Sequence, residues 1–370
     1  MRLPALFTVP GDALAGAAAA SARPTSRTLL AIASSLCLYE AGMALNDWAD
    51  RDVDAVERPH RPLPSGRVHP AAALGAACAL TGAGLTLAAC AGRPALTIAV
   101  PLAATVWAYD LALKDTPAGP FAMATARGLD LLLGAAATAG GVGVGPGVGQ
   151  RNAVRGGTWT RVTPLPGSLL GNLESVPAAA LPGVRQALPS AVLLGAHTLA
   201  VTAVSRREAQ GGSALAPFAA LAATAVLTRT VTGRRSLPSD RTDASRRGPG
   251  SRHAAGAPHL ADLAAAAVSR LPRRPRRPGA DSEPLDTHAA LRLALAAGYA
   301  ATTARSYLHA TLNPSPPLTQ RAVTAGIRAT IPLQAALAAR SRTKSATVTA
   351  LLTTALAPLA GRFARKVSVT

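Results

Sequence analysis

The chain has 370 residues, of which 49% are hydrophobic, 15% charged and only 3% aromatic, and its formal net charge is +20. Soluble domains usually carry about 25% charged residues, so a chain this apolar and this basic is neither an acidic soluble protein nor a mostly disordered one. Its three cysteines all lie in apolar runs and do not indicate a disulfide scaffold. The basic runs lack the interleaved aromatic side chains that single-stranded nucleic acid requires, so we expect no nucleic-acid partner.

Apolar stretches rich in alanine and glycine recur along the chain, and most approach the ~20 residues that cross a bilayer as a helix. Small residues in such stretches allow helices to approach closely. We therefore predict an all-α, polytopic integral membrane protein with about nine transmembrane helices, in which the last two stretches form either two helices or one broken unit. The stretches lie at residues 3–20, 27–47, 70–91, 94–113, 121–145, 187–205, 214–231, 287–311, 320–339 and 345–360.

The first stretch also has features of a secretory signal, because Arg2 precedes an apolar run and Ala20-Ser21-Ala22 matches an A-x-A cleavage site. Asp12, Pro4 and Pro10 are unfavourable in the apolar part of a signal. We therefore expect an uncleaved first helix.

Two segments differ in composition from the apolar stretches. Residues 146–183 are rich in glycine and proline, and residues 232–285 contain arginine runs among proline, serine and glycine. Both are predicted to be disordered loops, with binding of anionic lipid headgroups as the alternative for the second. They divide the chain into helical regions at residues 1–145, 184–231 and 286–370.

A polar cluster stands at the end of the second apolar stretch. Asp47, Asp50 and Asp54 are separated by three and four residues, a spacing that places all three carboxylates on one face of an α-helix. Three like charges in that arrangement repel one another unless a cation neutralises them. Mg²⁺ prefers hard oxygen ligands and bridges carboxylates to substrate phosphates. The spacing therefore predicts a magnesium site.

The residues around these aspartates extend the prediction. Asn46 borders the acidic face, Pro59 is expected to end the helix, and Arg58 and Arg61 follow within reach of phosphate oxygens. Together they predict a metal–diphosphate site at the membrane surface. The alternative is an ordinary charged helix end at the interface, where ionisable groups are well tolerated.

This stretch resembles a known family. Asn46-Asp-x-x-Asp50-x-x-x-Asp54, followed by Arg58-Pro and Arg61-Pro-Leu, is similar to the first aspartate-rich motif of UbiA-type intramembrane prenyltransferases. The similarity is greater still to the EboC-like branch of actinobacteria and cyanobacteria. It covers most of the chain except the two predicted loops, and it includes Ala126-Arg127-Gly128-Leu129 and the run from His197 to Arg206.

The resemblance implies an all-helical membrane bundle with a central cavity and an enzyme that transfers an isoprenoid chain from a Mg²⁺-bound prenyl diphosphate to an acceptor. It implies that Asp47, Asp50 and Asp54 act as catalytic metal ligands and that Asn46, Arg58 and Arg61 contact the substrate diphosphate. The family usually carries a Tyr…Lys stretch where Tyr109 and Lys114 stand, which implies a substrate-binding tyrosine and a catalytic lysine. A lysine that snorkels to the interface is the alternative for Lys114. Arg127 and Arg206 are further expected substrate contacts.

The second acidic motif of the family is incomplete in this chain. Where two carboxylates are usual, Val204 and Glu208 stand, so Glu208 is the one expected metal ligand there, with Arg206 beside it. This thinning suggests an alternative function, a membrane protein that binds or exports a prenyl-phosphate lipid without transferring the chain. His197, deep in the same apolar run, is expected to be a hydrogen-bonded core histidine or to line the acceptor pocket.

The membrane topology is predicted from the requirement that the motif loops form one active site. With a cytoplasmic N-terminus, the loops at residues 48–70, 114–120 and 206–213 all fall on the cytoplasmic side of a multi-pass plasma-membrane protein. The arginine-rich 232–285 loop then falls outside, against the positive-inside tendency, at a length where that rule weakens. The partners expected are a prenyl diphosphate, an unidentified acceptor and the bilayer. The sequence leaves the oligomeric state open.

Overall fold

The computed structural model describes residues 8–140, 181–206, 208, 213–233, 287–341 and 343–367, and these residues form helices and connecting turns without a strand. The predicted loops at 146–183 and 232–285 lie outside the described residues, except at their edges: residues 181–183 begin a helix, and Thr232 ends another. The helices are α2 (Val9–Ala19), α3 (Ser26–Ala49), α4 (Arg51–Glu57), α5 (Pro70–Ala91), α6 (Arg93–Ala108), the π-helical turn η1 (Tyr109–Leu113), α7 (Gly119–Ala139), α8 (Leu181–Ser205), α9 (Leu215–Thr232), α11 (Thr287–Leu312), α12 (Pro316–Ala338) and α13 (Lys344–Val367).

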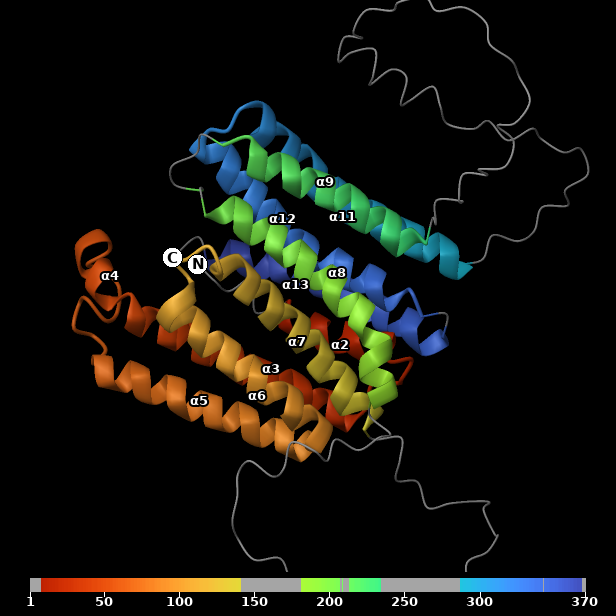
Figure 1. Ribbon diagram of the computed structural model, residues 1–370, viewed down its shortest axis with the longest axis horizontal. Helices are drawn as coiled ribbons and strands as arrows, with labels where there is room; N and C mark the ends of the chain where they lie inside the picture. Colours follow the sequence, from red (N-terminus) through yellow and green to blue (C-terminus); the bar gives the residue numbers. More distant parts are fainter. Residues whose placement is uncertain are drawn as a thin grey trace, which may run out of the picture. The chain divides into compact units, whose positions relative to one another are not determined.

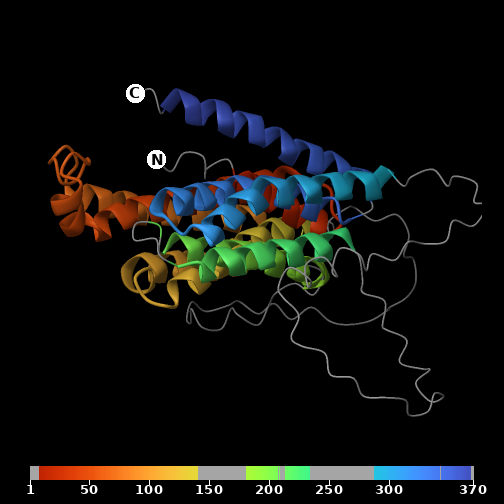
Figure 2. The same ribbon diagram turned by 90° about the horizontal axis from the view of Figure 1, so that it is seen from above.

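The long helices of residues 8–233 and 288–367 run side by side, as Figures 1 and 2 show. Helix α7 is central, because it packs against α2, α3, α6 and α8. Helix α3 lies along α5 on one side of this centre, and α12 packs against α8 and α13 on the other. The last two apolar stretches are therefore two separate helices that pack against each other.

Small residues allow the central helices to approach closely. A Cβ atom added at Gly134 of α7 would fall inside contact distance of the main chain of Ala13 in α2, and one at Gly16 would overlap the main chain at Leu131. The surrounding core is built largely from fully buried alanines with leucines between them. Close backbone approach takes the place of large side chains, as is common between helices in membranes.

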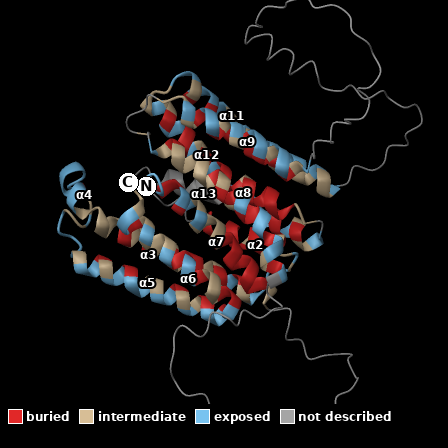
Figure 3. Ribbon diagram, viewed as in Figure 1, coloured by how far each residue is buried: buried red, intermediate tan, exposed pale blue. Residues whose placement is uncertain are grey.

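Several features indicate that this bundle crosses a membrane. Five of the described helices are long and apolar enough to span one: Ser26–Ala49, Pro70–Ala91, Arg93–Leu113, Pro182–Ser205 and Leu215–Thr232. Figure 3 shows buried residues concentrated around α2, α7 and α8 and exposed residues along the outer helices. The outer surface carries exposed apolar side chains such as Leu29, Val192 and Phe218, as a lipid-facing surface does. The fold is thus an all-α membrane bundle, and the number of nine spans stays a prediction.

Helix ends that are far apart in the sequence meet at one end of the bundle. The Lys114 side chain, just after η1, pairs with Asp50 at the end of α3. The Arg206 side chain, just after α8, donates to the main-chain oxygen of Thr116. These two contacts bring the ends of α3, η1 and α8 together at one end of the bundle, and the side of the membrane on which this end lies stays a prediction.

Candidate functional site

The aspartates of the first motif lie where one helix ends and another begins. Helix α3 ends at Ala49, Asp50 forms the junction, and α4 starts at Arg51. The chain still turns helically here, because the Asp54 N–H donates to the Asp50 main-chain oxygen over 2.8 Å. Asp47 and Asp54 therefore belong to different helices, and the single continuous helix expected from the spacing is replaced by two helices joined at Asp50. Helix α4 ends at Glu57, before the predicted stop at Pro59.

Arg61 links the aspartates on either side of this junction. Its Nη1 atom is 2.5 Å from Oδ2 of Asp54 and 3.8 Å from Oδ1 of Asp47. Asp54 is only 3% exposed, and Arg58 lies 3.5 Å from its other oxygen. A buried carboxylate needs such partners because burial without them is costly. The predicted diphosphate arginines are thus both at the site, paired with Asp54.

Asp50 is held by two further predicted site residues. Asn46 Nδ2 donates to its Oδ2 atom over 3.1 Å, and Lys114 Nζ donates to Oδ1. The π-helical turn η1 brings Lys114 to this place, since the Lys114 N–H bonds back to the oxygen of Tyr109 over 2.9 Å. Such π-turns inside α-helices are frequent at functional sites. Lys114 therefore points to the acidic cluster and not outward along the interface.

Arg206 and Glu208, from the incomplete second motif, follow the end of α8. The Arg206 guanidinium is tied to main-chain oxygens, those of Thr116 and, at 3.5 Å, Asp115. Glu208 is partly buried, and loss of solvent raises the pKa of its carboxyl group. Arg207 lies outside the described residues. The structure thus brings Arg206 to the loop after η1 without directing its guanidinium at the aspartates.

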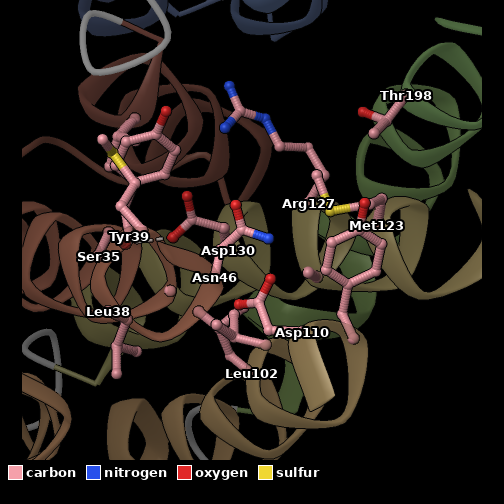
Figure 4. Close-up of a pocket in the computed structure, with 16 residues that line it drawn as sticks. Ser35, Leu38, Tyr39, Asn46, Leu102, Asp110, Met123, Arg127, Asp130 and Thr198 are labelled. Atoms are coloured by element: carbon pink, nitrogen blue, oxygen red, sulfur yellow. Dashed lines mark hydrogen bonds between the residues drawn. The ribbon is translucent and has the colours of Figure 1, made fainter. Parts of the chain in front are cut away.

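A cavity of about 360 Å³ opens beside this cluster and runs inward between α3, α6, η1, α7 and α8. In Figure 4 the side chains of Asn46, Asp110 and Asp130 point into the space between the helices. One part of the wall is apolar, with Leu38, Leu102, Val106 and Met123. The remaining lining residues include Ser35, Tyr39, Gly42, Asn46, Tyr109, Asp110, Arg127, Asp130 and Thr198.

Arg127, an expected substrate contact, and Asp130 line the cavity and belong to a buried ionic network that the sequence did not predict. Arg127 Nε is 3.0 Å from Oδ2 of Asp12, which is 0% exposed. Gln334 Nε2 donates to the other oxygen of Asp12 over 2.6 Å, and Ser35 donates to Asp130. The available signal was an acidic residue inside an apolar run, since ionisable groups within membrane helices usually mark functional sites.

His197 belongs to the core. Its ring nitrogens lie 3.1 Å from the hydroxyl of Tyr299 and 3.1 Å from the main-chain oxygen of Gly326. It is 2% exposed and is absent from the cavity lining. Of the two interpretations offered by the sequence, the structure favours the hydrogen-bonded core histidine.

The donor chemistry of the cluster fits Mg²⁺. The side chains of Asp47, Asp50 and Asn46 offer hard oxygen atoms at one helix end, and the carboxylates are paired with the cationic groups of Arg61 and Lys114. The described part of the chain contains no cluster of three or more His, Cys, Asp or Glu side chains arranged as a metal cage. The three-carboxylate magnesium site predicted from Asp47, Asp50 and Asp54 is therefore not formed as one group in this structure, and an ion bound there would be held by one or two carboxylates and completed by substrate phosphates and water.

Comparison with known proteins places the chain beside membrane prenyltransferases. The model of the UbiA prenyltransferase family matches residues 5–233. A digeranylgeranylglyceryl phosphate synthase of Methanothrix thermoacetophila is 37% identical over 107 residues, 29% of this chain and 40% of the relative. The enzyme of the same name from Methanopyrus kandleri is 37% identical over 113 residues, 30% of this chain and 40% of the relative. The chain thus matches less than half the length of these two relatives.

Among solved structures, the apo structure of a UbiA homolog from Aeropyrum pernix K1 superimposes with a TM-score of 0.51. The sequences are 17% identical, and the match covers 90% of this chain and 96% of that one. At this identity the likeness concerns the fold.

Proposed function

The chain belongs to the UbiA prenyltransferase family, and we propose that it transfers an isoprenoid chain from a Mg²⁺-bound prenyl diphosphate to an acceptor and releases diphosphate. One observation carries this proposal: Asp50 with Lys114, and Asp47 and Asp54 with Arg61, assemble acidic and cationic side chains from separate parts of the chain beside a partly apolar cavity. Carboxylates to hold a metal, cations to hold phosphate and a cavity for hydrocarbon are the parts that this reaction needs.

Residues of this chain have separable roles in the proposed reaction. Asp47 and Asp50, with Asn46 beside them, would hold Mg²⁺, which supplies charge neutralisation of the diphosphate as it leaves. Lys114 and Arg61 would exchange their carboxylate partners for phosphate oxygens when the substrate enters. Donors fixed before the reaction stabilise the charge that grows on the leaving group.

Arg58 supports the same binding surface. It approaches Asp54, with which Arg61 also pairs. Tyr109 and the aliphatic side chains Leu102 and Val106 line the cavity, where they would exclude water from the electrophilic allylic carbon. Glu208 would contribute one acid from the second motif, and Arg206 would hold the adjoining loop in place through Thr116.

We also propose a branch of the family, a membrane location and an orientation for the chain. The motifs around Arg127 and His197 support placement in the EboC-like branch. The five apolar helices support a multi-pass membrane protein, and the plasma membrane is the location we propose for it. The shared end of α3, η1 and α8 supports one active site, which we propose to lie on the cytoplasmic face. Reporter fusions after residues 66 and 260 test that orientation, with opposite locations expected.

The experiment for the proposed reaction uses the full chain reconstituted in lipid. Asp47→Ala and Asp50→Ala are expected to abolish release of diphosphate from a radiolabelled prenyl diphosphate. Asp52→Asn is the control, because Asp52 is 83% exposed and pairs with Arg51 outside the cluster. Near wild-type turnover by both alanine variants contradicts the proposal.

The second motif, which lacks one of its two usual carboxylates, favours a second function. Glu208 is the one acid of that motif, where the family usually carries two. A protein that binds or exports a prenyl-phosphate lipid needs the phosphate contacts without turnover. Labelled prenyl diphosphate distinguishes the two functions: retention without chain transfer or diphosphate release supports the binding protein, and release supports the enzyme.

A further inference from the structure

The end of the bundle opposite the aspartate cluster is basic. Helices α9 and α12 end here, and α11 and α13 begin here, with the end of α9 and the start of α11 at the right of Figure 1. Cations such as Arg23, Arg93 and Arg185 stand here, and the described helix ends and turns of this end contain no aspartate or glutamate. In the adjoining segments 141–180 and 234–286, whose structure is not described, arginines also outnumber acidic residues in the sequence. Positive charge is therefore in excess both at this end and in the segments that adjoin it.

Two of the arginines at this end are neighbours, Arg292 in α11 and Arg340 just after α12. Leu295, one turn after Arg292, packs against the buried cluster that includes Ala338 and Ala339, the two residues directly before Arg340. Burial, and then the charge of Arg292, lower the pKa of the Arg340 guanidinium. Arginine nevertheless stays protonated in proteins, because its ordinary pKa exceeds 12. Two half-buried positive charges therefore lie side by side where α11 and α12 meet.

Part of each guanidinium group is buried without a partner. Nε of Arg292 and Nη1 of Arg340 are shielded from solvent and form no hydrogen bond, and none of the described carboxylates pairs with either side chain. Carbonyl groups at a helix end attract cations, and the Arg292 guanidinium lies beside Gly233 at the end of α9, where an added Cβ atom would be 3.6 Å from Nη2. That attraction explains why arginines stand here, but it leaves donor atoms unpaired, which is costly for charged groups.

The arrangement fits the phosphate group of a lipid. Guanidinium groups donate to phosphate oxygens in a bidentate manner, and one anion between two of them offsets their repulsion. The ends of membrane helices lie at the bilayer surface, where anionic headgroups attract basic residues. The chain itself offers few acids for this purpose, because arginines outnumber them in both adjoining segments.

We propose that Arg292 and Arg340, where α11 and α12 meet, bind the phosphodiester headgroup of an anionic phospholipid at the membrane surface. The guanidinium nitrogens that are not buried would donate to its oxygens. This site lies at the other end of the bundle from the aspartate cluster, and it does not depend on prenyl transfer.

The test measures the affinity of the purified full chain, in a non-ionic detergent, for two short-chain fluorescent lipids. Phosphatidylglycerol and phosphatidylcholine both carry a phosphodiester, but the choline ammonium of the second compensates its charge and would face the arginines. The wild-type protein is expected to bind phosphatidylglycerol at least about tenfold more tightly, a difference of about 1.4 kcal/mol. Equal affinity for the two lipids overturns the inference.

Arg340→Gln and Arg292→Gln each remove one charge of the pair and keep much of the side chain. Either variant is expected to reduce the preference to less than threefold, so the second serves if the first does not fold. Lys344→Gln is the matched control, because it removes one exposed charge at the same end and is expected to keep the preference. A preference that is unchanged in the folded arginine variants, or lost equally in the control, overturns the inference.

Inorganic phosphate distinguishes a lipid site from a site for a soluble anion. It is expected to displace phosphatidylglycerol far less effectively than unlabelled phosphatidylglycerol does, because it lacks the acyl chains that hold the headgroup at the bilayer surface. Equally effective displacement overturns the assignment to a lipid.

A stability measurement separates lipid binding from a structural role of the pair. Two cations that repel each other do not stabilise the fold by themselves, so Arg340→Gln is expected to unfold at the wild-type temperature or above it without phosphatidylglycerol. Added phosphatidylglycerol is expected to raise the unfolding temperature of the wild type more than that of the variant, since a ligand that binds the folded state stabilises it. A variant that the lipid stabilises as much as the wild type overturns the inference.

Discussion

Lys114 donates a hydrogen bond from Nζ to Oδ1 of Asp50, although 64 residues separate them in the sequence. The pair joins the π-helical turn after α6 to the end of α3. Asp50 also accepts from Asn46, so its carboxylate is oriented from two directions before any substrate binds. Removal of either partner should therefore disturb both the acid cluster and the binding of phosphate.

Replacement of Lys114 tests the phosphate-binding role. Lys114→Met keeps much of the side-chain volume but removes the charge, and prenyl transfer is expected to fall about 100-fold, the size of effect seen when one transition-state donor is lost. Turnover and prenyl diphosphate affinity are measured together. Lys344→Met is the control, because Lys344 is exposed at the start of α13, at the other end of the bundle. A Lys114→Met variant as active as the control contradicts the assigned role.

Asp54 is expected to matter for stability as well as for function. Asp54→Asn leaves Arg61 and Arg58 without their buried carboxylate partner, and we expect a loss of about 1–3 kcal/mol of unfolding free energy, limited because both arginines retain some solvent contact. Thermal unfolding in detergent measures this change. Asp52→Asn should unfold like the wild type, and equal behaviour of the two variants speaks against a structural role for the buried pairs.

The close contact between α2 and α7 gives a prediction about the fold. Gly134→Ala places a Cβ atom against the main chain of Ala13, and overpacking of this kind typically costs about 1–3 kcal/mol. Gly75→Ala is the control, because a Cβ atom there meets nothing within 4 Å. The unfolding temperature should fall for Gly134→Ala and stay or rise slightly for Gly75→Ala. An unchanged unfolding temperature for Gly134→Ala would contradict the close packing of α2 against α7.

The sequence predicted the parts of the fold that depend on local pattern. Apolar length and small residues predicted a helical membrane protein, and the spacing of Asp47, Asp50 and Asp54 predicted an acidic cluster. The break between α3 and α4 at Asp50 was not predictable, because spacing alone is the same for one helix or for two joined in register. The pairing of Lys114 with Asp50 depends on tertiary contacts, although the family resemblance pointed to the lysine.

The buried ionic network around Arg127 illustrates what sequence pattern misses. Asp12 and Asp130 are single acids in separate apolar helices, and neither forms a motif. The two acids belong to one network because α2 and α7 pack closely and place both carboxyl groups near Arg127. A single charge within an apolar run indicates a buried partner but does not identify it. The partner became known only from the three-dimensional arrangement.

The central claim is that the aspartates at the end of α3 bind a diphosphate through a divalent ion. It is tested most directly by the affinity of the wild-type protein for a prenyl diphosphate in nanodiscs, measured with Mg²⁺ and after its removal by a chelator. We predict at least about a 100-fold loss of affinity without Mg²⁺, about 2.7 kcal/mol, restored when Mg²⁺ is added back. An affinity that is the same with and without the ion would contradict the account.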